Sequence, residues 1–429
     1  LTGAYARVRK QFGIPIARFE GVQEPLARIA GRTYRMDAAR LLTMVALDQG
    51  EKPAVLSAIL KYQLTEGNRQ TINDAMDVHG GKGIIQGPNN YLSHAYQSVP
   101  IAITVEGANI LTRSLIIFGQ GAIRAHPWLL KEMNAARSAA GSQGRRDFDT
   151  ALFSHIGYVI SNAVRAFMLA VSGGFATSAP VRGPTARYYR QLTRMSAVFA
   201  LLADAVLATL GGKFKFRESL SGRFADALIH LYLSTAVLKR FEDDGRPPGD
   251  LALVRWALED SLFTIQQSLV GVLRNFPLRP LGVLLRWICF PLGLPCGPPR
   301  DRTMQSAAAV LLSENESRDR LTHGVYLSDA DDATGRVLTA FHLALESADA
   351  EQAIRNALGE SVSIDNYEAL VKRAVESGVI TEEQATAVRV AQQAAIRVIE
   401  VDDFSRSHIE GFDEPAFRPA VRTPASASG

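Results

Sequence analysis

The segment HGGKGIIQGPNNYLSHAYQSVPIAITVEGANILTR, residues 79–113, decides the fold of the first part of the chain. It opens with glycines after a helical pattern, continues as an irregular polar segment, and places Glu106 between two apolar runs. A lone carboxylate there has two interpretations. It is either a residue at a helix N-terminus, stabilised by the helix dipole while Gly107 lets the chain turn, or a general base whose pKa is raised by desolvation. The local sequence favours neither.

The glycine cluster of Gly80, Gly81 and Gly83 also has two interpretations. It follows a helical pattern instead of a strand, which is the wrong context for a dinucleotide-binding or phosphate-binding glycine loop. The glycines either end the helix or let backbone N–H groups approach a ligand closely, because no Cβ is in the way. On the residues alone, the helix-ending role is favoured.

Apolar residues at helical spacing surround this segment. The sequence predicts a helix within residues 1–14, long helices over 22–50 and 53–78, a loop over 84–100, and another helix over 108–118. No stretch alternates convincingly between apolar and polar residues, as a half-buried strand would. The pattern therefore predicts an all-α fold that begins with an up-and-down helical bundle.

Residues 138–147 are rich in Ser, Gly and charged residues and predict a domain boundary. The bundle is assigned to residues 1–137, a second helical domain to 148–405, and a disordered tail to 406–429. Amphipathic helices of the second domain are predicted over 148–171, 187–210, 219–241, 250–273, 333–357, 364–376 and 382–400.

The composition is that of a globular protein, with 47% hydrophobic and 21% charged residues among 429. The net charge of +4 is small and no basic run is interleaved with aromatics, so nucleic acid is not an expected partner. Two cysteines indicate no disulfide framework, and the eight histidines show no ligand spacing, so no metal is expected. Because the chain starts with Leu1 inside a helical pattern, without a signal peptide, we expect the C-terminal part of a longer protein.

Residues 278–295 read LRPLGVLLRWICFPLGLP and are almost wholly apolar. Two arginines and three prolines interrupt the run, which a membrane-spanning helix of about 20 apolar residues would not tolerate well. Either the segment is a buried hairpin or core element, or it lies in a membrane interface with Trp287 and the arginines at headgroup level.

Three motifs together carry a family resemblance: YARVRKQFGIPI at residues 5–16, GGKG at 80–83 and VEGAN at 105–109. In this order and spacing they resemble the C-terminal helical domain of the acyl-CoA dehydrogenases, over residues 1 to about 120. The remainder, to about residue 404, is similar to the long C-terminal extension of the large bacterial members. The stretches NFPLRPLG and VDDF are part of that likeness.

The resemblance implies a flavoenzyme with FAD as cofactor. Glu106 matches the family's base, which removes the α-proton of an acyl-CoA thioester while the β-hydrogen leaves as hydride to flavin N5. The thioester carbonyl is held in the family by the base's own backbone N–H and a flavin hydroxyl. Gly107 and Arg113 are accordingly assigned to the substrate, Arg113 on the CoA side.

Arg9, Phe12 and Ala108 match positions that contact FAD, and Gly80 and Gly81 match a turn that lies against the FAD of a neighbouring subunit. The resemblance thus makes the whole segment 79–113 one wall of a flavin site. Three departures weaken individual flavin contacts: Asp77 and Glu20 where relatives often have glutamine, and Ala108 where threonine is common. Two extra carboxylates near an anionic cofactor are unfavourable unless they point away or find basic partners.

The expected function is dehydrogenation of medium- or long-chain fatty acyl-CoA to trans-2-enoyl-CoA in fatty acid β-oxidation. This chain alone is expected to be inactive without an N-terminal half. Expected partners are fatty acyl-CoA, an electron-transfer flavoprotein and further copies of the chain, in the cytoplasm or peripherally on the inner membrane. The alternatives are an acyl-CoA oxidase and a non-catalytic helical interaction module.

Overall fold

The computed structural model describes residues 1–121, 126–137, 142–328 and 331–404, and they are almost entirely helical. The predicted tail and part of the predicted boundary therefore lie outside the described residues. The first part of the chain consists of α1 (Thr2–Val8), β1 (Lys10–Gln11), β2 (Ile14–Pro15), η1 (Ile16–Arg18), α2 (Glu20–Asp48), α3 (Ala54–His79), α4 (Gly81–Ile84), α5 (Ser93–Thr104), α6 (Asn109–Leu111) and the π-helix η2 (Thr112–Gln120). The long helices α2 and α3 confirm the predicted helices over 22–50 and 53–78.

The helix predicted within residues 1–14 ends at Val8, and a small hairpin follows it. Gln11 pairs with Ile14, so Phe12 and Gly13 form a two-residue turn. Both turn residues have positive φ, 51° and 75°, as the tight turns that match strand twist require. A phenylalanine at positive φ is uncommon, which is why the turn was not legible in the sequence.

The loop predicted over 84–100 was wrong for its second half, because α5 begins at Ser93 and contains Pro100. The start of α5 is fixed by Asn90, whose side-chain oxygen accepts hydrogen bonds from the backbone N–H groups of Leu92 (2.9 Å) and Ser93 (3.0 Å). Pro100 cannot donate to the carbonyl of Tyr96, but this part of α5 is exposed and water can serve that carbonyl. The interior proline misled the prediction.

The second part of the chain is a longer series of helices, in which six of the seven predicted helices are present with shifted ends. The helices of this part are α8 (Leu129–Arg137), α9 (Ser142–Val171), α10 (Ala186–Leu210), η3 (Gly211–Phe216), α11 (Glu218–Asp243), η4 (Pro248–Asp250), α12 (Leu251–Arg274), α13 (Arg279–Cys289), α14 (Asp301–Ala309), η5 (Val310–Leu312), α15 (Glu316–Thr322), α16 (Ala333–Glu346), α17 (Ala348–Leu358), α18 (Tyr367–Glu376) and α19 (Glu382–Ile399). The helix predicted over 333–357 was wrong as a single helix, because the chain breaks at Ser347 into α16 and α17.

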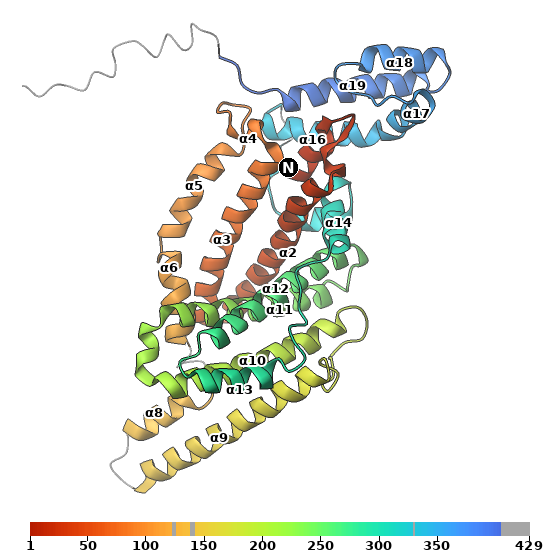
Figure 1. The fold of residues 1–429 in the computed structure, drawn as a ribbon. Coiled ribbons are helices and arrows are strands. Elements are labelled where there is room, and N and C mark those ends of the chain that lie inside the picture. The colour runs from red at the N-terminus through yellow and green to blue at the C-terminus, as the bar shows by residue number, and fades with distance from the viewer. Residues whose placement is uncertain (122–125, 138–141, 329–330, 405–429) are drawn as a thin grey trace, which may run out of the picture.

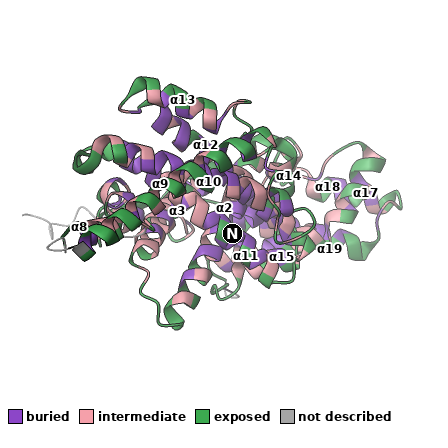
Figure 2. Cartoon of the chain, turned by 90° about the horizontal axis from the view of Figure 1, so that it is seen from below, coloured by how far each residue is buried: buried purple, intermediate pink, exposed green. Residues whose placement is uncertain are grey.

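One hydrophobic core connects the two parts of the chain. It contains residues from Ala4 to Val398, and α2 packs against α3 on one side and against α11, α12 and α14 on the other (Figure 1). The packing is closest where Gly31 faces Trp256, since a Cβ on Gly31 would lie 2.1 Å from the indole ring. Figure 2 shows the buried surface of these helices in the middle of the molecule and mostly exposed residues on α17 at one end. The predicted division into 1–137 and 148–405 does not separate two cores.

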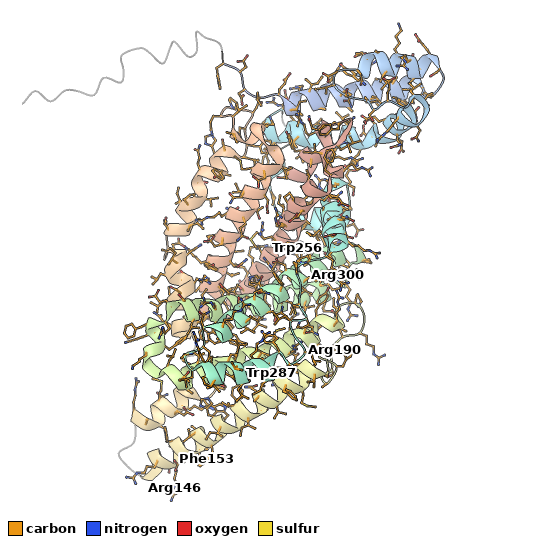
Figure 3. All side chains as sticks on the ribbon, in the orientation of Figure 1. Arg146, Phe153, Arg190, Trp256, Trp287 and Arg300 are labelled. Atoms are coloured by element: carbon orange, nitrogen blue, oxygen red, sulfur yellow. The ribbon has the colours of Figure 1, made fainter. Side chains whose placement is uncertain are left out.

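Two neighbouring helices leave apolar side chains in solvent, and we call this surface the apolar face. On α9 its members are Phe153, Ile156, Ile160, Val164, Phe167, Met168 and Val171, and on and around α13 they are Leu278, Val283, Leu284, Trp287, Leu292 and Leu294. Because α13 buries only Gly282, Leu285 and Cys289, the interpretation of 278–295 as a buried hairpin was wrong. Helix α13 packs on α9 near the lower end of the molecule (Figure 3).

Length and composition alone would allow two helical stretches of the described chain to cross a membrane, residues 143–171 and 186–216. The bent pair of α5 with α6 and η2 would add a third if it counted as one span. The two stretches differ in how far the protein covers them: 17% of the apolar window of the first is buried, against 44% of the second. Helix α10 is thus largely a core helix, and α9 is the one that faces outward.

Candidate functional site

Glu106 lies in a strained turn between α5 and α6. Its φ is 55° and that of Gly107 is 94°, so two consecutive residues are in the left-handed region. For a residue with a Cβ this conformation costs about 1–3 kcal/mol and persists only when the surrounding structure enforces it. Glu106 precedes the N-cap residue Ala108 of α6 and lies outside the first helical turn. The helix-start interpretation therefore does not explain it.

Lys61 on α3 enforces this turn. Its ammonium group donates to the carbonyl oxygens of Gly107 (2.6 Å) and Ile103 (3.3 Å) and to the side-chain oxygen of Asn109 (2.7 Å). One cation thus holds the end of α5, the turn itself and the start of α6. Charge-assisted hydrogen bonds of this kind are about twice as strong as neutral ones.

Asn109 completes the anchor and is buried. Its amide group donates to Thr65 Oγ1 (2.9 Å) and Glu66 Oε1 (2.9 Å), one helical turn along α3 from Lys61. Sequence reasoning missed both Lys61 and Glu66, because nothing in their local pattern marks them. Asn109 was visible as the last residue of the VEGAN motif, but no role followed from that.

The turn also presents backbone donors. Among the described residues, the N–H groups of Glu106, Gly107 and Ala108 have no hydrogen-bond acceptor. Successive N–H groups in such a turn form a concavity that attracts a partially negative oxygen. The Glu106 side chain is exposed to solvent in this chain, so the expected apolar pocket around it is not formed by the described residues.

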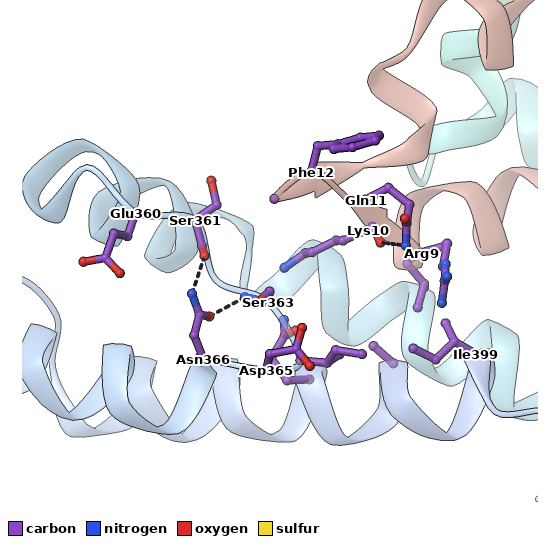
Figure 4. A pocket seen from close by; sticks show the side chains of 15 residues that line it. Arg9, Lys10, Gln11, Phe12, Glu360, Ser361, Ser363, Asp365, Asn366 and Ile399 are labelled. Carbon is purple, nitrogen blue, oxygen red and sulfur yellow. Dashed lines mark hydrogen bonds between the residues drawn. The ribbon is translucent and has the colours of Figure 1, made fainter.

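Arg9 and Phe12 lie at the opposite end of the bundle, beside a cavity of about 570 Å³ (Figure 4). Among the described residues, Arg9 has no acidic partner. Phe12, at the hairpin turn, is 93% exposed. The opposite wall of the cavity comes from the segment before α18, which includes Asp365 and Asn366. The hairpin is tied to that region by Lys10, whose ammonium group lies 2.6 Å from the carboxylate of Glu351.

The turn at Gly80 and Gly81 lies near this end as well. Gly80 ends α3 with a φ of 58°, and a Cβ on either glycine would meet nothing within 4 Å. The preceding residue, His79, stacks on Tyr5 of α1 at 4.1 Å and hydrogen-bonds to Tyr91, which places the turn beside the N-terminal helix. Burial lowers the pKa of His79 to about 4, so the ring is neutral at pH 7.

The glycine turn and Glu106 do not lie together as one wall of a flavin site within this chain. Lys61, which holds the Glu106 turn, and His79, which precedes the glycines, are 18 positions apart in α3. At about 1.5 Å per residue the separation is roughly 27 Å. The segment 79–113 therefore contributes to two places, one at each end of α3, and the expectation of a single wall was wrong.

Arg113 is engaged by another part of the protein. Its Nε and Nη2 atoms donate to the two carboxylate oxygens of Asp226 on α11, at 2.6 and 2.5 Å. The pair joins η2 to α11 across the shared core. A bidentate partner of this kind leaves the guanidinium little capacity for CoA, which weighs against the predicted substrate role.

The structure assembles one histidine cluster that the sequence did not reveal. His126 and His155 both approach the buried carboxylate of Asp204, at 2.6 and 3.5 Å, and His155 also contacts Glu132 at 2.8 Å. His126 Nδ1 accepts the backbone N–H of Leu129, so its Nε2 carries the proton and donates it to Asp204. That Nε2 has no lone pair for a metal. The residues come from distant parts of the chain, so no spacing signal existed.

Comparison with known proteins identifies both parts of the chain. Residues 1–119 match the family "Acyl-CoA dehydrogenase, C-terminal domain", and residues 123–404 match "Acyl-CoA dehydrogenase, C-terminal, bacterial type". A 3-(aryl)acrylate reductase of Clostridium sporogenes is 34% identical over 115 residues, 26% of this chain and 29% of that protein. The mitochondrial very long-chain specific acyl-CoA dehydrogenase of Mus musculus is 25% identical over 237 residues, 55% of this chain and 34% of that protein.

A solved structure supports the fold. The Bacillus anthracis acyl-CoA dehydrogenase complexed with FAD aligns with a TM-score of 0.53 at 18% identity, over 72% of this chain and 52% of that one. The chain spans about a third of the length of the curated relatives named above. Since the bacterial-type match alone covers more than half of the residues, the chain belongs to the acyl-CoA dehydrogenase family.

Proposed function

We propose that this chain forms the C-terminal part of an FAD-dependent acyl-CoA dehydrogenase in which Glu106 is the catalytic base. The observation that carries the proposal is the strained turn at Glu106 and Gly107, held in place by Lys61. A left-handed glutamate with an exposed carboxylate is costly for folding alone, and such strain concentrates at functional sites. Glu106 matches the position of the catalytic base in the family motif, which supports the role of a base for the residue in this turn.

The residues present fit an FAD molecule at the hairpin end of the bundle. Arg9 supplies a cation with no acidic partner among the described residues, and an arginine suits the two phosphates of FAD. Gly80 and Gly81 offer an open backbone surface. The carboxylate of Asp365, which lines the same cavity, would repel the pyrophosphate of FAD. Arg9 would therefore bind the pyrophosphate on the side of the cavity away from Asp365. When bound, FAD supplies the acceptor for the β-hydrogen of the substrate.

The residues of this chain would act on the substrate's α-carbon and carbonyl. The carboxylate of Glu106 takes the α-proton, and the free backbone N–H groups of the turn receive the thioester oxygen as negative charge builds on it. Lys61 acts as a positioning residue, since it contacts the Gly107 carbonyl and not the substrate. Its positive charge near the turn also favours the charge that develops on the oxygen.

Two further assignments rest on this proposal. The substrate class is fatty acyl-CoA of medium or long chain; the name of the mouse relative, a very long-chain specific acyl-CoA dehydrogenase, supports the acyl-CoA part of this assignment. The assembly is a homo-oligomer: Lys61, which holds the Glu106 turn, and His79, which precedes the glycines, are about 27 Å apart along α3, so two copies are needed to bring both places to one flavin. An electron-transfer flavoprotein is proposed as the acceptor.

The experiment is an anaerobic titration of the complete, flavin-loaded protein with palmitoyl-CoA. Loss of the absorbance of oxidised flavin, with formation of trans-2-enoyl-CoA, is the expected result. An unchanged spectrum at saturating acyl-CoA would refute the dehydrogenase proposal. Admitting oxygen then distinguishes the closest alternative, since rapid formation of hydrogen peroxide would identify an acyl-CoA oxidase.

We also propose that the apolar face rests on a membrane, placing the protein peripherally on the inner membrane near its hydrophobic substrates. Helix α13 has Trp287 and neighbouring arginines, the residues expected at headgroup level, and α9 continues the exposed apolar surface from Phe153 to Val171. Burying two large apolar side chains contributes about 1.5–3 kcal/mol each, enough to change vesicle binding strongly.

In a flotation assay, the chain is expected to rise with vesicles of phosphatidylglycerol and phosphatidylethanolamine. The double variant Val283→Glu/Trp287→Glu should stay in the bottom fraction. Tyr326→Glu is the matched control, because Tyr326 is 83% exposed but lies outside the apolar face. If the double variant still floats and its oligomeric state changes instead, a second copy covers this face and the membrane proposal fails.

A further inference from the structure

A second cleft lies between the beginnings of α10, α12 and α14. Its volume is about 890 Å³, and it shares no lining residue with the cavity beside Arg9. We call it the arginine cleft, because six arginines line it: Arg182, Arg187, Arg190, Arg255, Arg300 and Arg302. Figure 3 labels Arg190 on α10 and Arg300 just before α14.

The positive charge of the cleft is not compensated by the protein. Glu259 is the one carboxylate among its described lining residues. That carboxylate is already occupied, since it accepts from Arg187 (2.9 Å), Tyr188 (3.1 Å) and Thr303 (3.1 Å). The other five arginines have no acidic partner in the part of the chain that the structure describes.

Helix geometry adds to this charge. Helices α10, α12 and α14 have 25, 24 and 9 residues and all begin at the cleft. None of the three starts has a side-chain hydrogen bond to its free backbone N–H groups. Helix N-termini attract anions and disfavour cations, yet Arg187 and Arg302 lie in the first turns of α10 and α14. Asp301 in the first turn of α14 and Asp250 at the N-cap of α12 offset part of this positive field, while α10 has no acidic residue in its first turn.

The guanidinium group of Arg190, one of the arginines that line the cleft, is held in place by an aromatic ring. It packs over the ring of Phe175 at 5.1 Å, and its Nε atom is buried without a hydrogen-bond partner. A buried donor without an acceptor is costly, and native proteins satisfy nearly all of them. A ligand in the cleft would meet the guanidinium of Arg190, which Phe175 holds in place and which has no acidic partner among the described residues.

We propose that the arginine cleft binds a small molecule that carries a diphosphate or triphosphate group. Guanidinium groups bind phosphate oxygens in pairs of parallel hydrogen bonds, and helix N-termini add backbone donors for the same oxygens. Several neighbouring negative charges are needed to balance five free arginines, which a single carboxylate or monophosphate does not supply. The volume is that of a site for a ligand of nucleotide size. The proposal stands independently of the acyl-CoA dehydrogenase chemistry.

Calorimetric titrations of the chain with inorganic pyrophosphate and with ADP test this, at low and at physiological salt. Both probes are expected to bind, and more weakly as salt increases. In Arg300→Gln/Arg302→Gln, affinity should fall roughly tenfold or more, since two charge-assisted contacts are lost. Arg274→Gln is the control for the single cleft variant Arg255→Gln, because both arginines are exposed on α12 and each substitution removes one positive charge, inside the cleft at Arg255 and outside it at Arg274.

The thermal melt of each variant separates binding from folding. Because Arg300 and Arg302 have no partners to lose, their replacement should leave the melting temperature unchanged or raise it. Arg255→Gln serves as a second cleft variant. Absence of binding by both probes, or equal weakening in Arg255→Gln and Arg274→Gln, overturns the proposal. Binding only to phosphatidylglycerol vesicles or only to RNA also overturns it, since the ligand would then be a surface or a polymer.

Discussion

Replacing Glu106 by glutamine in the complete protein will leave flavin binding intact and reduce dehydrogenation by several orders of magnitude. Glutamine preserves the shape of the side chain and its backbone position, but it cannot accept the α-proton. General base catalysis contributes about 10²–10⁴-fold to the rate. The loss should appear in kcat, measured with palmitoyl-CoA and an artificial electron acceptor, with little change in the flavin spectrum.

The matched control is Glu51→Gln, which removes one exposed carboxylate from the segment between α2 and α3. It should behave as the unmodified protein in the same assay. A second variant, Lys61→Met, tests the positioning role: it should lower kcat without removing the base, because the turn loses three hydrogen bonds. Near-normal turnover in Glu106→Gln would rule out Glu106 as the base.

The largest effect on stability is expected for Asp74→Ala. The carboxylate of Asp74 accepts from Arg28 at 2.7 Å and from Arg32 at 3.0 Å, and both Asp74 and Arg32 are buried between α2 and α3. Without Asp74, a buried guanidinium has no counter-charge. Removing one partner of a buried ion pair costs about 3–5 kcal/mol in the free energy of unfolding. Urea unfolding followed by circular dichroism measures the change.

Two controls distinguish the buried charge from a general effect of alanine. Glu24→Ala removes the other acidic partner of Arg28, but that pair is largely exposed, so the loss should be below about 1 kcal/mol. The double variant Arg32→Met/Asp74→Leu replaces both charges by apolar groups and should recover much of the stability. A small effect of Asp74→Ala, similar to that of Glu24→Ala, would contradict the argument.

The sequence predicted the long helices well, because each has a strong apolar period and clear Gly or Pro limits. The start of α19 is an example: Thr381 and Gln384 form the reciprocal cap that a helix start at Thr381 suggests. The hairpin after Val8 could not be predicted, because it depends on a phenylalanine at positive φ. The shared core could not be predicted either, since periodicity shows that a helix has an apolar side but not which helix covers it.

For the site, the family motif identified Glu106 and Gly107, but not the residues that hold them. Lys61 acts across α3, and a lysine in an amphipathic helix gives no sign of its tertiary role. The error about one wall could not be avoided from the sequence, because the contact between Lys61 and the Gly107 carbonyl that places the Glu106 turn along α3 has no local signal. The roles assigned to Arg9, Phe12 and Ala108 remain predictions. The contact of Arg113 with Asp226 could not be predicted, because the two residues are 113 positions apart in the sequence.

The contact of Gly31 with Trp256 limits which substitutions and which exchanges of segments this chain can accept. Helix α2 belongs to the part that matches the general C-terminal domain, and α12 to the part that matches the bacterial-type one. Their indole-on-glycine fit leaves no room for a side chain, so one half cannot be exchanged for its counterpart from a relative unless the partner surface changes with it. The long C-terminal region is therefore not a detachable accessory, and in a chimaera the two halves must be transplanted together.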